Sequence, residues 1–197
     1  MNTKLKEIIF QNREEALDFI EKENQILESI QNGETNSNAR KFIAHKSEYK
    51  GFEYYIVRHT NAYNSNAFYL CGYVVLDEVT DNLFQSLFKL LNKDYKDIIS
   101  CHGGLTYEGN NFIDIQSKEL MIGFDCSHAG DIISMDKAEI TRIKSTSANY
   151  SYKTFYFVED NCRSIIDQLI EISTQYKDCK NGREGALQEI NDLFTNL

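Results

Sequence analysis

Two stretches rich in β-branched and aromatic residues, 52–59 (FEYYIVRH) and 67–76 (AFYLCGYVVL), constrain the fold of this chain more than any other feature. Val, Ile, Tyr and Phe favour strands, and the segment between the stretches, 61–66 (NAYNSN), has the composition of a turn. The pair predicts a β-hairpin. An isolated hairpin is barely stable in water, so the rest of the chain has to supply further strands or helices to cover it.

Apolar residues at strand or helix spacing supply such elements on both sides of the hairpin. Together they predict an α+β fold, in which a small, mainly antiparallel sheet is packed by N-terminal and C-terminal helices. The predicted strands span 98–107, interrupted by Gly103–Gly104, and 119–125, and the predicted helices span 12–32, 80–92, 155–177 and 184–194.

The length of 197 residues suits one domain, and 42% hydrophobic with 26% charged residues is typical of a folded globular protein. We therefore expect a single α+β domain over 1–197. Its motif-bearing core covers about 52–170, with helical additions at 1–33 and 182–197.

Composition excludes several classes of protein. A net charge of −9 disfavours binding to duplex nucleic acid, which requires clustered Lys and Arg. No apolar run reaches the length of about 18 residues that suggests a membrane span, and the charged start MNTKLKEIIFQNREE does not read as an export signal. Five cysteines without a Cys-x-x-Cys pair fit a reducing compartment, so we expect a cytoplasmic protein.

The densest chemistry lies in two motifs, 101–107 (CHGGLTY) and 123–131 (GFDCSHAGD), both placed where predicted strands end. The paired glycines Gly103 and Gly104 permit positive φ angles and close approach of a ligand, so their amides could face an anion. Within seven residues the second motif offers two carboxylates, a thiol and an imidazole.

The catalytic candidates in these motifs are His102, Asp125, His128 and Asp131. They could hold a divalent metal ion, although their spacing matches no named metal signature. They could equally work without metal, with His102 as general acid or base oriented by Asp125 or Asp131.

Two other interpretations remain open. Cys126 or Cys101 could be a nucleophile activated by a histidine, although cysteines beside strands more often pack as small apolar residues. Alternatively the motifs are structural: the glycines form a bulge, Asp125 or Asp131 caps a turn, and the histidines donate hydrogen bonds in a polar core.

Further residues are candidates for contact with a ligand, namely Gly103, Gly104, Thr106, Tyr107, Cys126 and Tyr73. Tyr73 belongs to the triplet Cys71–Gly72–Tyr73, whose glycine suggests a bulge or a close backbone approach, and core packing is the favoured role of that triplet. Arg58 and His59 could join the site, but solvent-facing roles are favoured for them.

At its two motifs the chain resembles a family of small phage and prophage proteins with His-Gly-Gly-Leu-Thr followed by Phe-Asp-Cys-Ala-His-x-Gly-Asp. Here these read His102–Thr106 and Phe124–Asp131, with Ser127 in place of the alanine. Cys71–Gly72–Tyr73 and the start of the 155–177 helix also resemble that family. The resemblance implies a phage-type accessory protein that acts on host metabolism or host defence.

We expect this protein to bind, and as a hydrolase to cleave, a small phosphorylated or nucleotide-like ligand at the two motifs, using His/Asp acid–base or metal-assisted chemistry. The alternative is a non-enzymatic inhibitor that binds a host protein through an acidic surface. The sequence indicates neither the oligomeric state nor the identity of a cofactor, a divalent metal ion being one option.

Overall fold

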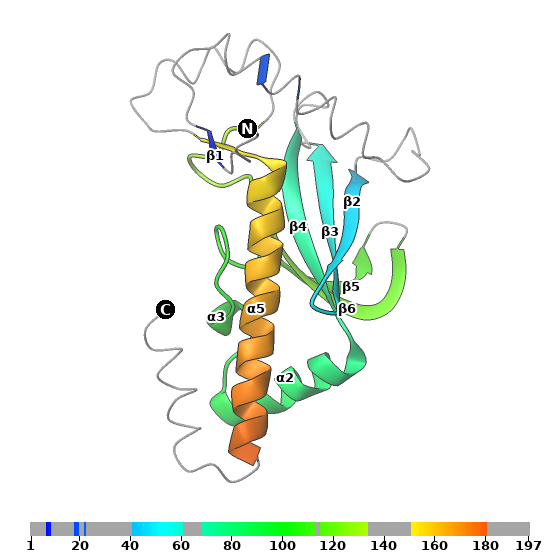
Figure 1. Cartoon of the computed structure of the whole chain (residues 1–197), viewed down its shortest axis with the longest axis vertical. Helices are drawn as coiled ribbons and strands as arrows, with labels where there is room; N and C mark the ends of the chain where they lie inside the picture. Colours follow the sequence, from blue (N-terminus) through cyan, green and yellow to red (C-terminus); the bar gives the residue numbers. More distant parts are fainter. Residues whose placement is uncertain are drawn as a thin grey trace.

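The structure is a computed structural model that describes residues 7–8, 18–19, 22, 41–60, 68–112, 115–133 and 151–180 (Figure 1). Its centre is a five-stranded antiparallel sheet in the order β2-β3-β4-β6-β5. A separate pair of short strands joins β1 to β7 near the start of the long helix α5. The strands are β1 (Glu7–Ile8), β2 (Lys41–Tyr49), β3 (Phe52–Thr60), β4 (Phe68–Leu76), β5 (Tyr107–Phe112), β6 (Ile115–Asp125) and β7 (Tyr152–Lys153), and the helices are α2 (Glu78–Leu91), α3 (Tyr95–Ile98) and α5 (Phe155–Lys180).

The α+β class and the mainly antiparallel sheet are confirmed. The predicted hairpin is the β3–β4 pair, with registers that run from Tyr54↔Val74 to Thr60↔Phe68. The predicted 119–125 strand lies within β6, and the helices predicted at 80–92 and 155–177 correspond to α2 and α5. The helices predicted at 12–32 and 184–194 fall outside the described residues, except that Asp18, Phe19 and Lys22 are helical. Strand β2 was not predicted.

The strand predicted at 98–107 is wrong. Residues 95–98 form the short helix α3, because Asp94 caps it in a capping box with Asp97. A turn follows, closed by a hydrogen bond from the Gly104 N–H to the Cys101 carbonyl at 3.0 Å, and strand β5 begins only at Tyr107. The apolar residues Ile98, Ile99 and Leu105 are buried in these irregular segments. These residues are apolar because they are buried, although they do not form a strand. This explains why the apolar pattern wrongly predicted one.

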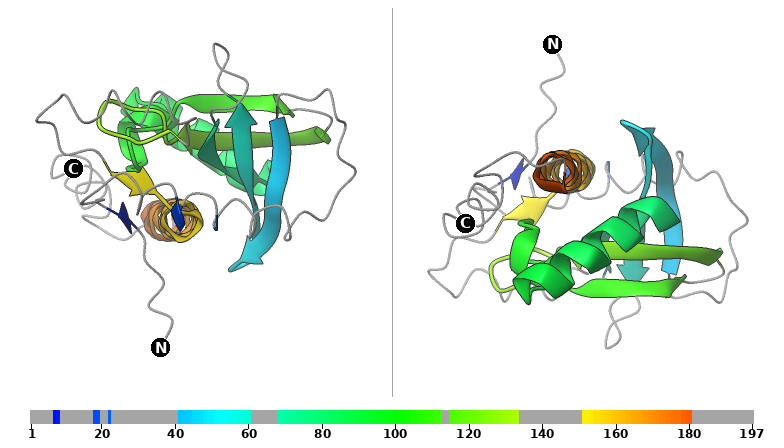
Figure 2. Two further views of the ribbon diagram at one scale, coloured as in Figure 1. Left: turned by 90° about the horizontal axis from the view of Figure 1, so that it is seen from above. Right: turned by 90° about the horizontal axis from the view of Figure 1, so that it is seen from below.

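Helices α5 and α2 lie against one face of the sheet (Figures 1 and 2). Alternate residues of β3, β4 and β6 point to this face and join apolar residues of the helices in one core cluster. At Gly72 of β4 an added Cβ atom would lie 2.6 Å from Cys162 Sγ and 2.6 Å from the Phe124 ring. The expected close approach at this glycine is therefore confirmed. Within the described ranges no helix is both long enough and apolar enough to cross a bilayer.

The opposite face of the sheet carries a second buried cluster made of the other alternate residues. The cluster consists of Tyr55, Val57, Cys71, Tyr73, Val75 and Met121. His59 belongs to this face: it is only 6% exposed, and its Nε2 lies 2.9 Å from the Tyr73 hydroxyl. The expected solvent-facing role of His59 is therefore wrong, because the ring stacks on Tyr69 and bonds Tyr73 inside the protein.

His45 joins β2 to α5. Its ring contacts Phe155 edge-on, with ring centroids 5.2 Å apart, and lies 6.2 Å from the Tyr54 ring. Burial lowers the pKa of His45 below its ordinary value of 6.5, with a smaller opposing effect from Glu159 and a smaller lowering effect from Arg163. The folded state therefore binds a proton at this site less readily than the unfolded state does.

We predict that His45 makes the fold less stable in mild acid. Because the unfolded chain takes up the proton first, stability is fully present above pH 6.5 and decreases as pH falls below that value. In His45→Phe, which keeps an aromatic ring between Phe155 and Tyr54, the free energy of unfolding measured in urea should fall less between pH 7 and pH 5 than it does in the wild type. An equal decrease in both proteins would contradict the assignment.

Candidate functional site

His102, His128 and Asp131 come together beside the first turns of α5. The Nε2 atom of His102 lies 2.8 Å from Oδ2 of Asp131, and the backbone N–H of His128 donates to the same oxygen at 3.0 Å. The two imidazole rings are in edge-on contact, with centroids 5.3 Å apart. The structure thus joins the two sequence motifs at one carboxylate.

Asp131 is the buried centre of this cluster, with a side chain only 3% exposed. Its second oxygen, Oδ1, lies 3.8 Å from Nζ of Lys153, which also donates to the Ser151 hydroxyl at 2.7 Å. Strand β7 brings Lys153 here, because Ser151 forms a parallel bridge with Asp131. Sequence analysis missed Lys153 and Ser151, since no local pattern connects them to a residue twenty positions upstream.

Helix α5 fixes the position of His102. The His102 backbone N–H donates to Asn161 Oδ1 at 3.1 Å, and Asn161 in turn donates through Nδ2 to the Phe157 carbonyl at 2.9 Å. The His102 ring packs edge-on against the Phe157 ring, with centroids 5.2 Å apart. These two α5 residues also escaped the sequence analysis, because both follow the ordinary helical pattern of polar and apolar positions.

Gly103 is required by the approach of His128. Its φ is +65°, and an added Cβ would lie 1.8 Å from Nε2 of His128. That Nε2 is buried, and it has no hydrogen-bond partner within the described part of the chain. Its closest acidic neighbour is Oδ1 of Asp125, at 3.9 Å. The glycine predicted to admit a ligand thus admits the ring of His128.

Both carboxylates also stabilise the turn of the second motif. Oδ1 of Asp125 accepts from the Ser127 N–H at 2.9 Å, and Asp131 accepts from His128 as described. The structural role expected for them as turn caps is therefore present. The N–H of Gly104, which we expected to face an anion, donates instead to the Cys101 carbonyl.

The cysteines of the motifs are poor nucleophiles. Burial raises the pKa of the Cys101 thiol to about 12. Burial, and then the Asp131 charge, raise the pKa of Cys126 well above its ordinary value. Because the thiolate is the reactive form, both groups are protonated and unreactive at neutral pH.

The remaining predicted ligand contacts lie elsewhere. Tyr73 belongs to the buried cluster on the opposite face of the sheet, where its ring contacts Tyr107 edge-on with centroids 5.4 Å apart. Thr106 is exposed, and its backbone N–H donates to the Gly123 carbonyl at 2.9 Å. These residues are therefore not grouped with His102. Asp125, the last residue of β6, pairs with Cys71 of β4, and its Oδ1 lies 3.9 Å from His128 Nε2.

No group of three or more His, Cys, Asp or Glu side chains among the described residues is arranged to hold a metal ion. The four residues that the sequence offered as ligands form hydrogen bonds and paired contacts with one another and with the backbone. In the described part of the chain, the acid–base interpretation therefore has more geometric support than the metal interpretation.

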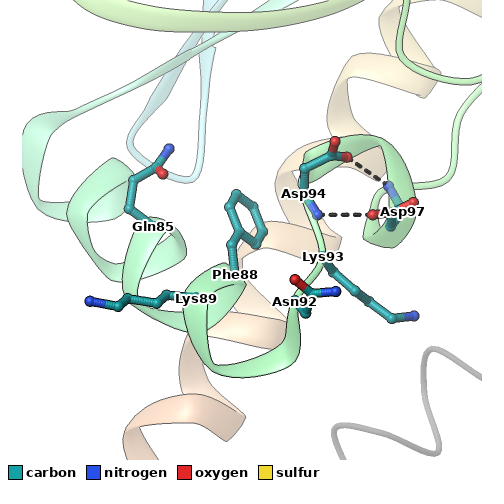
Figure 3. A pocket seen from close by; sticks show the side chains of 7 residues that line it. All are labelled: Gln85, Phe88, Lys89, Asn92, Lys93, Asp94 and Asp97. Carbon is teal, nitrogen blue, oxygen red and sulfur yellow. Dashed lines mark hydrogen bonds between the residues drawn. The ribbon is translucent and has the colours of Figure 1, made fainter.

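A shallow hollow lies between α2 and α3 (Figure 3). Its volume is about 540 Å³, and none of the predicted site residues lines it. Lys89 and Lys93 give it positive charge, while Asp94 and Asp97 are engaged in capping α3. The hollow thus offers positive charge to an anionic ligand but contains no imidazole, in contrast to the cluster around His102.

We predict that Gly103→Ala is more destabilising than Gly104→Ala. Both positions have positive φ angles, +65° and +81°, so both substitutions carry a similar backbone cost of about 1–2 kcal/mol. Only at Gly103 does the new methyl group collide with a ring, which adds roughly 1–3 kcal/mol. The free energy of unfolding in urea measures both. Adding His128→Ala to Gly103→Ala should recover the extra loss, and equal losses at the two glycines would contradict the contact.

A scan against protein-family models, a search of curated proteins and a search of solved structures found no match to this chain. The resemblance to phage and prophage proteins therefore stays a prediction based on the two motifs. The contacts of His102 and His128 with the Asp131 carboxylate are the observations that bear on function.

Proposed function

We propose that this protein binds a small phosphorylated or nucleotide-like ligand beside His102 and hydrolyses it by acid–base chemistry. The observation that carries the proposal is the 2.8 Å hydrogen bond between His102 Nε2 and the buried Asp131 carboxylate. An imidazole oriented by a buried carboxylate is a common arrangement for a general acid or base. His102 is 20% exposed, so the ring is within reach of a ligand from solvent.

The environment of Asp131 selects the tautomer of His102. The carboxylate accepts a hydrogen bond from the His128 N–H through Oδ2, and its Oδ1 lies 3.8 Å from the Lys153 ammonium. A carboxylate oxygen accepts hydrogen bonds, so in this pair Nε2 of His102 carries the hydrogen and donates it. Nδ1 then keeps the lone pair, which makes it the nitrogen that can take a proton.

The chemistry follows from this assignment. Nδ1 of His102 removes a proton from a water molecule as that water attacks phosphorus, and the bond from phosphorus to the leaving oxygen breaks. The proton then passes from Nδ1 to the leaving oxygen, so the ring returns to its starting state. Asp131 stabilises the imidazolium formed in between. The ring of His128 packs edge-on against His102 and helps to hold that ring in place.

The biological setting that we propose is that of a phage-type accessory protein acting in the host cytoplasm against a host defence. This setting is supported by the resemblance of the two motifs, His102–Thr106 and Phe124–Asp131, to phage and prophage proteins.

We predict that His102→Ala and Asp131→Asn each weaken ligand binding and abolish most turnover. Loss of a hydrogen bond to a charged group should weaken binding about tenfold or more, and loss of the acid–base group should slow turnover by about 10²–10⁴-fold. The measurement is a titration of the protein, with imidazole resonances followed by NMR, against inorganic phosphate and a panel of nucleoside mono-, di- and triphosphates. Phosphate release is assayed on the same samples.

The control is Lys89→Ala combined with Lys93→Ala, which removes cations from the hollow between α2 and α3 without touching His102. This control should bind and turn over like the wild type. If it alone loses the ligand, the site is the hollow and the proposal is wrong. If folded His102→Ala behaves like the wild type across the panel, the proposal also fails, and the acidic-surface inhibitor becomes the better hypothesis.

A further inference from the structure

The N-terminal segment contacts the strand that carries Lys153. Strand β1 pairs antiparallel with β7, with the registers Glu7↔Lys153 and Ile8↔Tyr152 (Figure 2). A second contact comes from Phe19, whose ring meets the Tyr152 ring edge-on with centroids 6.1 Å apart. Two separate parts of the N-terminal segment therefore converge on the two residues of β7.

The other edge of β7 belongs to the candidate site. The Ser151 N–H donates to the Gly130 carbonyl, and the Ile132 N–H donates to the Ser151 carbonyl, both at 2.9 Å. Successive backbone groups along a strand point to opposite edges. Ser151 thus faces the 130–132 segment while Tyr152 faces β1. The short strand is held between the N-terminal segment and the segment that contains Asp131.

A strand of two residues has little stability of its own, because it has few hydrogen bonds to offset the loss of backbone entropy. On the site side, backbone hydrogen bonds of Ser151 join β7 to the 130–132 segment. The β1 pairing and the Phe19 contact lie on the residues that follow, Tyr152 and Lys153. Residues more than a hundred positions earlier in the chain therefore contact the strand that carries Lys153.

We propose that β1 and Phe19 support the candidate site, and that Phe19 is a positioning residue that acts through Tyr152 and β7 to hold the Lys153 ammonium beside Asp131. The inference rests on the proposed function for its significance, because Lys153 lies beside the carboxylate that orients His102. It gives a role to Glu7, Ile8 and Phe19, which belong to the stretch that the sequence presented as an addition outside the motif-bearing core.

Hydrogen exchange of the full chain tests the inference without any ligand. In Phe19→Ala, the amides of Ser151 and Ile132 should exchange about tenfold faster or more, because the strand they hold opens locally. The amide of Cys126, bonded to the Leu70 carbonyl beside the central sheet, should keep its rate. Phe19→Tyr, which retains the ring, should restore the wild-type rates.

A spectroscopic signature reports on Lys153 directly. Its Nζ lies 5.0 Å from the centroid of the Phe157 ring, so its ε-methylene protons should show a ring-current shift in the wild type. That shift should be lost in Phe19→Ala. It should be kept in the control Leu90→Ala, which removes an exposed apolar side chain from α2. An unchanged Lys153 signal in Phe19→Ala would contradict the positioning role.

Two results of the hydrogen-exchange experiment would contradict the inference. Unchanged exchange at Ser151 and Ile132 in Phe19→Ala would overturn the inference, and so would an equal acceleration at Cys126, because that would indicate general destabilisation. Since no ligand is used, failure of the wild type to bind phosphate would overturn the proposed function and leave this result unaffected.

Discussion

The contact between helix α5 and strand β4 sets the position of everything else in this structure. At Gly72 the helix lies so close to the sheet that an added methyl carbon would come within 2.6 Å of Cys162 Sγ. A protein interior packed this tightly leaves the helix little freedom to slide. The same helix carries Phe157 and Asn161, which hold the ring and the backbone of His102. The geometry of the polar cluster is therefore fixed by an apolar contact on the sheet.

The Asp131 carboxylate is almost completely buried, and this burial determines which groups have to surround it. A buried charge is costly unless donors and an opposite charge surround it. Asp131 obtains these from three separate segments: His102 from the first motif, the His128 N–H from its own turn, and Lys153 from β7. The carboxylate thus joins three segments that are far apart in the chain. This makes the cluster a structural junction as well as a candidate site, and the two roles use the same hydrogen bonds.

The sequence predicted those features that local patterns encode. Alternating aromatic and branched residues indicated the β3–β4 hairpin, and the density of ionisable residues singled out His102 and Asp131 before their contact was known. The strand at 98–107 failed because the capping role of Asp94 turns that stretch into a short helix and a turn. Lys153 and Asn161 were missed for a different reason. Their roles depend on which distant residues the fold brings beside them, and no periodicity within the chain records that.

The junction between β7 and α5 has a mechanical consequence. Thr154 alone separates Lys153 from the first residue of the helix, and its hydroxyl accepts a hydrogen bond from the Phe157 N–H at 3.2 Å, so the strand leads directly into the first turn of the helix. A helix of 26 residues, at a rise of about 1.5 Å per residue, is about 39 Å long. A tilt of about 5° around its midpoint would displace its first turn by roughly 1.7 Å. A displacement of that size is enough to break a hydrogen bond, so the close contact at Gly72, which holds α5 against the sheet, also matters for the position of Lys153.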